Sequence, residues 1–257
     1  MRRMIAWLSS RPEHRFGIGK AIGVLFLLLL VTGTLAFVRQ VYQYYSDIRS
    51  GEIDPVFERS FGSSVSNRSV SPNVSKSDLL RLQSDDAPSI GSKDAPVVMV
   101  EFLDYGCPFC KQSFEHVRQL VTERPDDVRL IVRDFPIEYL HPGATRASMA
   151  ARCVMQIDPN KFWGYHDRLF LNQQFGDKDL SRYAQESGVS VMLFEDCLAS
   201  ERTRPVVETD IALGLQTGVR GTPTFFFNGH RVQGSLDREA FDAIIKWLGK
   251  QHTNSTK

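Results

Sequence analysis

Near its N-terminus, the chain has one long run of uncharged and mostly apolar residues. Residues 21–38 read AIGVLFLLLLVTGTLAFV, eighteen residues without a charge. A run of that length predicts a membrane-spanning helix. Residues 39–60 are polar and aromatic and are compatible with a short helix, whereas residues 61–77 are rich in serine and have almost no apolar period. Such a composition cannot bury a core, so it predicts a flexible stalk.

Beyond the stalk, short apolar runs that suit strands are separated by apolar residues at helical spacing. Residues 96–103 (PVVMVEFL) are rich in valine and suit a buried strand, and residues 128–133 (VRLIVR) suit a second one. Between them, four apolar residues share one face of a helix: Cys110, Phe114, Val117 and Val121. This β-α-β order predicts neighbouring parallel strands.

The second half of the domain is predicted to be helical at first and then to return to the sheet. Residues 142–200 contain an alanine-rich stretch, an aromatic stretch and two shorter helical segments, and residues 201–216 form a further helix. In TPTFFFNGHRV, Asn228 and Gly229 are a strong hairpin signal. A final helix has an apolar stripe formed by Phe241, Ile244, Ile245 and Leu248, and we expect Gly249 to end it. The order predicts an α/β protein, a thioredoxin-like core with an all-helical insertion at about 142–200.

Charge patterning gives the expected topology. Five basic residues precede the apolar run (Arg2, Arg3, Arg11, Arg15 and Lys20), and acidic residues soon follow it. The positive-inside rule then leaves the N-terminus in the cytoplasm and exports the rest. The expected organisation is a cytoplasmic segment over 1–20, a signal anchor over 21–38, a stalk over 39–85, a thioredoxin-like domain over 86–252 and a tail over 253–257. A cleaved signal peptide is the competing interpretation.

Composition removes some function classes. The chain has 257 residues, of which 42% are hydrophobic and 24% charged, as in an ordinary globular protein. A formal net charge of +1 gives no indication of a nucleic-acid partner. Its four cysteines are an even number, and in an exported domain disulfides form and persist.

Three interpretations compete for the motif Cys107-Pro108-Phe109-Cys110. A zinc site needs about four ligands, and the sequence has neither a second CxxC nor an HxxxH, so we expect no metal. A structural disulfide would close almost no loop and stabilise little. The third is a redox pair. It fits the placement, because Cys107 at a helix N-cap faces the free N–H groups that favour a thiolate, and proline is favoured at the next position.

Position in the predicted helix gives the two cysteines different roles. Cys110 lies one turn on, on the buried face, which suits a resolving cysteine that attacks a mixed disulfide at Cys107. Glu101 interrupts the apolar strand six residues before Cys107. It is either a solvated or ion-paired carboxylate, or a buried one that relays the proton of Cys110.

The stretches DAPVVMVEFLDYGCPFCK and VRGTPTFFFNG resemble the DsbA-like thiol:disulfide oxidoreductases of bacterial envelopes. The resemblance covers about residues 86–250. It implies a thioredoxin fold with a helical insertion, a buried acid at Glu101 and a cis-proline at Pro223. Thr222 is then where a substrate chain adds as a strand, and Pro108 and Phe109 contribute to the same substrate surface.

The resemblance also implies the cellular setting. The substrates are cysteine-containing exported proteins, a quinone-linked membrane partner reoxidises the pair, no cofactor is needed, and the catalytic domain lies on the periplasmic side of the bacterial inner membrane. Phe109 stands where the best-known oxidases have histidine, and Thr222 occurs in oxidising and isomerising relatives. A reductase or isomerase of the same fold therefore stays open, as does a non-catalytic chaperone or metal-delivery module.

The remaining cysteines, Cys153 and Cys197, both lie in the helical insertion. They are either two buried free thiols or one structural disulfide. Because the compartment is oxidising and the pair is even, we expect a Cys153–Cys197 disulfide. We expect His116 and His141 to be exposed and solvated.

Overall fold

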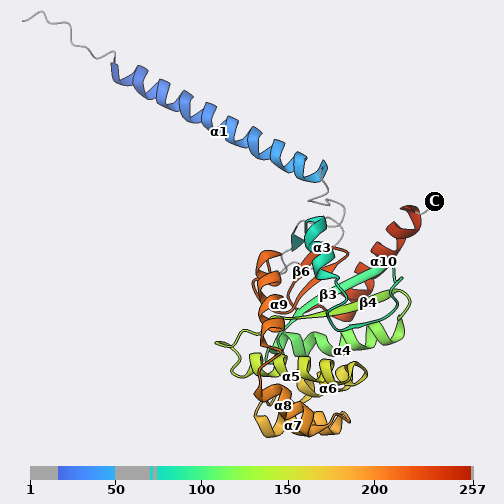
Figure 1. Ribbon diagram of the computed structural model, residues 1–257. Helices are drawn as coiled ribbons and strands as arrows, with labels where there is room; N and C mark the ends of the chain where they lie inside the picture. The colour runs from blue at the N-terminus through green and yellow to red at the C-terminus, as the bar shows by residue number, and fades with distance from the viewer. Residues whose placement is uncertain (1–16, 50–69, 72–73, 256–257) are drawn as a thin grey trace, which may run out of the picture. The chain divides into compact units, whose positions relative to one another are not determined.

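A computed structural model describes residues 17–49, 70–71 and 74–255, in two units, Met1–Gly51 and Glu52–Lys257. In the first unit, α1 (Gly17–Arg49) is one continuous helix (Figure 1). Over Ile22–Gln43 it is long and apolar enough to cross a membrane, with a mean hydropathy of 2.3. The helix continues past residue 38, where the apolar run ends, because polar and aromatic residues without proline or glycine do not stop a helix.

The second unit is built on one sheet. Its strands are β1 (Val70–Ser71), β2 (Ser89–Ile90), β3 (Val97–Leu103), β4 (Val128–Asp134), β5 (Thr224–Phe227) and β6 (His230–Gln233), in the order β1-β6-β5-β3-β4-β2. β3 and β4 are parallel, as the β-α-β pattern predicts, and β3 pairs antiparallel with β5. The turn between β5 and β6 has positive φ at Asn228 (48°) and Gly229 (94°), as a two-residue hairpin requires.

Helices cover both faces of the sheet (Figure 1). Their bounds are α3 (Lys76–Leu82), α4 (Pro108–Glu123), α5 (Ala144–Ile157), η1 (Pro159–Lys161), α6 (Phe162–Asn172), α7 (Asp177–Glu186), α8 (Val191–Ala199), α9 (Arg204–Gln216) and α10 (Arg238–Ser255). The helices α5 to α8 form the insertion, and α7 and α8 lie farthest from the sheet (Figure 1). The chain is thus a thioredoxin-like fold with an all-helical insertion and one apolar N-terminal helix.

The alternation of side chains along β3 divides the core in two. Met99 and Leu103 belong to the larger cluster, with the buried faces of α4 and α10. Val100 and Phe102 belong to the smaller cluster, with residues of α3 and α9. Glu101 shares its side of the strand with Met99, so its carboxyl group lies on the side of α4, where the cysteines are.

The C-terminal helix differs from the prediction. Its stripe of Phe241, Ile244, Ile245 and Leu248 is buried as expected. However, α10 runs through Gly249 to Ser255. One interior glycine costs a helix only about 1 kcal/mol relative to alanine, and the residues after it are compatible with a helix.

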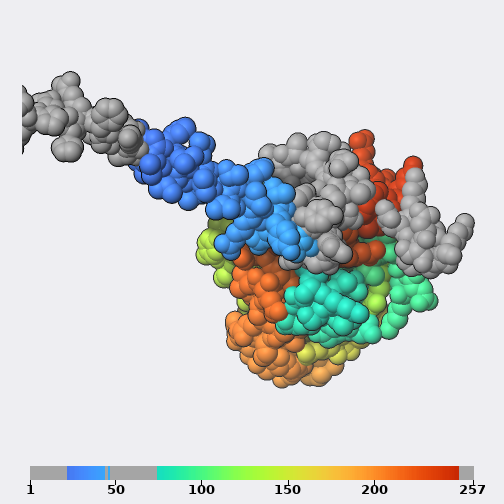
Figure 2. Space-filling model, turned by 90° about the horizontal axis from the view of Figure 1, so that it is seen from above, coloured from blue at the N-terminus to red at the C-terminus, as the bar shows by residue number. Residues whose placement is uncertain are grey.

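The folded unit also begins earlier than the expected boundary at residue 86. β1 pairs with β6, and α3 places Leu82 in the smaller core cluster. The Arg133 guanidinium donates to the carbonyl oxygen of Arg81, at 2.8 Å. Figure 2 shows the teal segment that contains α3 against the orange surface of α9. A single buried leucine in a polar stretch gives no helical period, so the sequence did not reveal this docking; the rest of the expected stalk, residues 50–69, lies outside the described residues.

A buried charge cluster joins the insertion to the sheet. Asp210 of α9 accepts from Arg133 of β4 at 2.9 Å and from Arg152 of α5 at 2.6 Å. Arg152 also pairs with Asp134, the last residue of β4. All four side chains are almost inaccessible to solvent. Removing one partner would leave a buried charge uncompensated, which is strongly destabilising, so the cluster specifies how α5 and α9 pack on the strand.

Candidate redox site

The two cysteines of the CPFC motif lie where strand β3 leads into helix α4. Cys107 is the N-cap residue of α4, with extended backbone angles (φ −75°, ψ 123°), and Pro108 follows at the first helical position. Proline suits that position because its missing N–H would have no helical partner there. Both Cys107 and Cys110 are free thiols, and both are buried.

The two thiols differ sharply in acidity. The Cys110 thiol donates a hydrogen bond to Cys107, and this bond, with Thr222 and the N–H groups of Cys110 and Phe109, lowers the pKa of Cys107 to about 6, although burial opposes the shift. Burial raises the pKa of Cys110 well above its ordinary range. The hydrogen bond to Cys107, the charge of Cys107 and the nearby Glu101 raise it further. At neutral pH Cys107 is therefore the thiolate and Cys110 the thiol that hydrogen bonds to it.

The loop before β5 completes the site from the other side of the sequence. The Thr222–Pro223 peptide bond is cis, and Pro223 is buried. The Cys107 thiol lies 3.3 Å from the carbonyl oxygen of Thr222, to which it donates when protonated. The structure therefore brings Cys107 and Thr222 into contact, although 115 residues separate them.

Glu101 is buried beneath the thiols, with 3% of its surface exposed. Burial raises the pKa of its carboxyl group to about 8. Among the side chains that the structure describes, none donates a hydrogen bond to this carboxyl group or forms an ion pair with it. A carboxyl group that is protonated near neutral pH and lies close to Cys110 can give or take the proton of that thiol.

The sequence did not indicate that Asp104 and His141 meet beside the CPFC motif. Asp104 is fully buried in the turn before Cys107, and its carboxylate lies 2.7 Å from Nδ1 of His141. His141 is thus not the solvated histidine that the sequence suggested; 19% of its side chain is exposed. The only local signal was an acidic residue between an apolar strand and a CxxC motif. His116, the other histidine expected to be exposed, is half-buried on α4.

Apolar side chains reach solvent around the motif. Phe109 is 59% exposed and Tyr139 84% exposed, and Pro108 is exposed as well. Tyr105, in contrast, is buried against Phe170. The exposed residues of the CPFC motif therefore present an apolar surface next to the thiolate.

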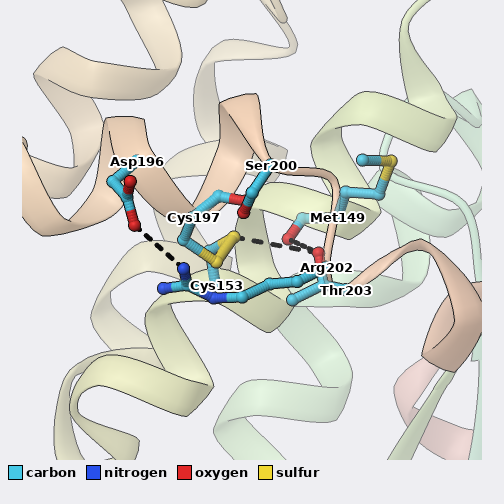
Figure 3. The surroundings of a disulfide bond; sticks show 7 residues. All are labelled: Met149, Cys153, Asp196, Cys197, Ser200, Arg202 and Thr203. Atoms are coloured by element: carbon cyan, nitrogen blue, oxygen red, sulfur yellow. Dashed lines mark hydrogen bonds and ion pairs between the residues drawn. A yellow bond between two sulfur atoms is a disulfide. The ribbon is translucent and has the colours of Figure 1, made fainter.

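The other two cysteines form a disulfide in the insertion, as the compartment argument expected. Cys153 of α5 and Cys197 of α8 are joined across a sequence separation of 44 residues. Both are fully buried, and Thr203 lies beside them, with its hydroxyl donating to the carbonyl oxygen of Met149 at 2.9 Å (Figure 3). Because no solvent reaches these sulfurs, they suit a structural crosslink. Within the described ranges, no three His, Cys, Asp or Glu side chains are grouped as metal ligands.

Comparison with known proteins shows the family to which this domain is similar. A sequence model of the family described as "Thioredoxin" matches residues 83–247. The chain is 35% identical over 156 residues, 60% of its length, to a Na(+)/H(+) antiporter NhaA 3 of Salinispora tropica. That match covers 24% of the antiporter, so the chain spans about a quarter of the length of the curated relatives it matches.

Two solved structures show the same fold. A thioredoxin-like oxidoreductase from Silicibacter pomeroyi is 26% identical, with a TM-score of 0.60 over 69% of this chain and 99% of its own. The thiol-disulfide exchange protein α-DsbA2 from Wolbachia pipientis is 21% identical, with a TM-score of 0.62 over 76% of this chain and all of its own.

Proposed function

Because the chain belongs to the thioredoxin family, we propose that it is a thiol:disulfide oxidoreductase whose redox-active pair is Cys107 and Cys110. The observation that carries this proposal is the asymmetry of the two thiols. One is a thiolate at a helix N-terminus, with a pKa of about 6, and its neighbour is a buried thiol whose pKa is raised. Disulfide exchange needs a thiolate that both attacks and leaves readily, together with a second sulfur that releases the bound substrate.

Each residue of the site has a distinct role in this proposal. Cys107 forms the mixed disulfide with substrate, Cys110 resolves it, and Glu101 exchanges the proton of Cys110. Pro223 shapes the groove beside Cys107, and the backbone of Thr222 pairs with the substrate chain. Pro108 and Phe109 offer the exposed apolar surface that the substrate contacts.

The substrates are cysteine-containing exported proteins, and in the oxidising direction a quinone-linked membrane partner accepts the electrons. A reductase or isomerase is distinguished by its resting state, in which Cys107 and Cys110 would be found reduced in cells. A non-catalytic chaperone or metal-delivery module would keep its function after loss of Cys110, whereas an exchange enzyme would not.

The direct assay uses the full chain in detergent, with the Cys107–Cys110 pair oxidised, and a reduced synthetic peptide that contains two cysteines. At pH 7, we expect each protein molecule to form one peptide disulfide, which mass spectrometry detects. When an external oxidant is supplied, turnover should continue. Failure to form any peptide disulfide, with the pair oxidised at the start, would contradict the proposal.

Glu101→Gln should change how stability depends on pH in the reduced protein. The carboxyl group has a pKa of about 8 when folded and an ordinary value when unfolded, so it favours folding at low pH. That stability is lost as pH rises from about 4.5 towards 8. The glutamine side chain does not titrate, so between pH 5 and pH 9 the wild-type protein should lose about 4 kcal/mol more of its free energy of unfolding than the glutamine variant. Urea denaturation at pH 5, 7 and 9 measures this, with exposed Glu115→Gln as the control; parallel profiles for all three proteins would refute the buried acid.

The apolar helix supports a single-pass anchor in the bacterial inner membrane. In this arrangement, residues 1–20 lie in the cytoplasm, and the redox domain, expected over 86–252 and extended here to include α3, lies on the periplasmic side. Relatives named as Na(+)/H(+) antiporters carry a similar domain, which also supports a place at the membrane.

A fusion after Lys257 tests this topology. Alkaline phosphatase, which is active only outside the cytoplasm, should be active in this fusion. N-terminal sequencing of the mature protein should find that residues 1–38 are still present. An inactive fusion would contradict the orientation. A mature N-terminus near Phe37 would instead show that the helix is a cleaved leader.

A further inference from the structure

The buried carboxylate of Asp104 organises the outer side of the site. Its Oδ1 accepts from the N–H of Gly106 at 2.7 Å, and its Oδ2 accepts from the N–H of Ile137 at 2.8 Å. The ring atom Nδ1 of His141 lies 2.7 Å from the same Oδ2. A carboxylate can only accept hydrogen bonds, so Nδ1 is the donor, and in the neutral ring Nε2 has a free lone pair.

The ring of His141 packs on the residue that precedes the nucleophile. A Cβ atom added to Gly106 would lie 2.5 Å from the Cβ of His141 and 3.2 Å from its Cγ, so glycine is required there. Only 19% of the His141 side chain is exposed, which leaves one edge in reach of an incoming chain. Asp104, from the β3–α4 turn, is the ionisable group in contact with the ring. Cys107 follows Gly106 in the chain, and Glu138 lies on the loop that carries the ring.

The loop that carries His141 is held at both ends. Ile137 is tied to Asp104, and the Glu138 carboxylate accepts from the N–H groups of Gly143 and Thr145, at 2.7 and 2.8 Å. Glu138 is therefore turned towards the start of α5 and does not compete for the ring. The loop presents His141 in one orientation, as an acid–base group must be presented.

Disulfide exchange at this site has two protons to handle. Glu101 is buried on the side of Cys110, so it serves that thiol. The substrate thiol arrives from solvent with an ordinary pKa of about 8.5, and only about 3% of it is ionised at pH 7. An external base next to Cys107 would raise the reactive fraction.

We propose that His141 and Asp104 are this second acid–base pair: Nε2 of His141 takes the proton of the substrate thiol, and Asp104 is the positioning residue that holds the ring in the required tautomer. The inference rests on the proposed exchange activity. The substrate thiol gives its proton to Nε2, its sulfur bonds to Sγ of Cys107, and the Cys107–Cys110 bond breaks with its electron pair on Sγ of Cys110. After His141 has passed the proton to solvent, the second substrate thiol loses its proton in the same way and attacks the substrate sulfur, and Cys107 leaves as the thiolate. The substrate is oxidised by two electrons, and the cysteine pair is reduced by two.

The test is the pH dependence of the reaction between the oxidised full chain in detergent and a reduced two-cysteine peptide, followed by stopped flow. We expect His141→Asn to react about tenfold more slowly at pH 6.5–7 and within twofold of wild type at pH 9.5, where the peptide thiol ionises unaided. Asp104→Asn should show the same pattern, since an amide group that donates to Nδ1 moves the ring hydrogen to Nε2. His116→Asn, the matched control on α4, should follow the wild-type profile.

A structural role for His141 would give a deficit of the same size at every pH, and that result, or no deficit at all, would overturn the proposal. A wild-type protein that does not oxidise the peptide would contradict the proposed function instead. In that case, the same variants are compared in the reverse reaction, in which His141 returns a proton to the leaving thiol. Nitrogen NMR of the His141 ring gives a readout independent of activity: a hydrogen on Nε2 in the neutral wild-type ring would also overturn the assignment.

Discussion

Cys107→Ala should abolish disulfide exchange with the two-cysteine peptide, a loss of at least about a thousandfold in rate, whereas Cys110→Ala, which cannot form the Cys107–Cys110 disulfide, should still form mixed disulfides through Cys107. The reason is the difference between the two sulfurs. Cys107 is the thiolate at the helix N-terminus, in contact with Thr222, and Cys110 is fully buried. With Cys110→Ala, Cys107 still attacks a disulfide but nothing releases the product, so mixed disulfides with exported proteins should accumulate.

Non-reducing gels of cells that express each variant measure this trapping. The double variant Cys107→Ala/Cys110→Ala is the background control, and Cys107→Ala should match it. Equal trapping by the two single variants would reverse or remove the assigned roles. A Cys107 thiol that titrates at its unperturbed value of about 8.5 would remove the physical basis for the nucleophile.

Cys153→Ala/Cys197→Ala should lower the free energy of unfolding by about 4 kcal/mol. The crosslink joins α5 to α8 across 44 residues, and removing it returns that loop entropy to the unfolded chain. The sulfurs are fully buried, so the alanine variant also loses some packing. Urea unfolding, with Cys107 and Cys110 kept reduced in both proteins, measures the difference.

The matching comparison is Cys107→Ala/Cys110→Ala, which changes two cysteines but removes no long crosslink. Its free energy of unfolding is measured with the Cys153–Cys197 disulfide intact and is compared with that of the wild type in which Cys107 and Cys110 are reduced. This difference should be far smaller than the loss in the Cys153→Ala/Cys197→Ala variant. Under mild reduction, alkylation should also reach Cys107 and Cys110 first. Free Cys153 or Cys197 in the oxidised protein, or an unchanged free energy of unfolding without them, would refute a stabilising crosslink.

Features governed by neighbours in the chain were accessible from the sequence. The CPFC motif after an apolar strand predicted a cysteine at a helix N-cap, and Cys107 lies there. The Asn228–Gly229 turn depends on two residues that tolerate positive φ, and the buried stripe of α4 depends on a spacing of three and four residues. In each of these cases, the physical cause acts within a few residues, so the pattern of letters contains it.

Local patterns gave no access to contacts between residues far apart in the chain. Arg133 and Asp210 are 77 residues apart, and the docking of α3 depends on a carbonyl group 52 residues from Arg133. The sequence of a charged residue and its neighbours does not show whether its side chain is solvated or buried with a partner.

The sequence alone determined the thioredoxin-like order of elements, the apolar N-terminal helix and the position of Cys107 at the start of a helix, because these follow from period, length and local backbone preference. Only the tertiary structure decided that Glu101 is buried and that Asp104 and His141, 37 residues apart, meet beside Gly106. The protonation state of a carboxyl group depends on burial and on partners that arrive through folding. The chemistry of this site therefore depends on long-range packing, which the period of apolar residues does not encode.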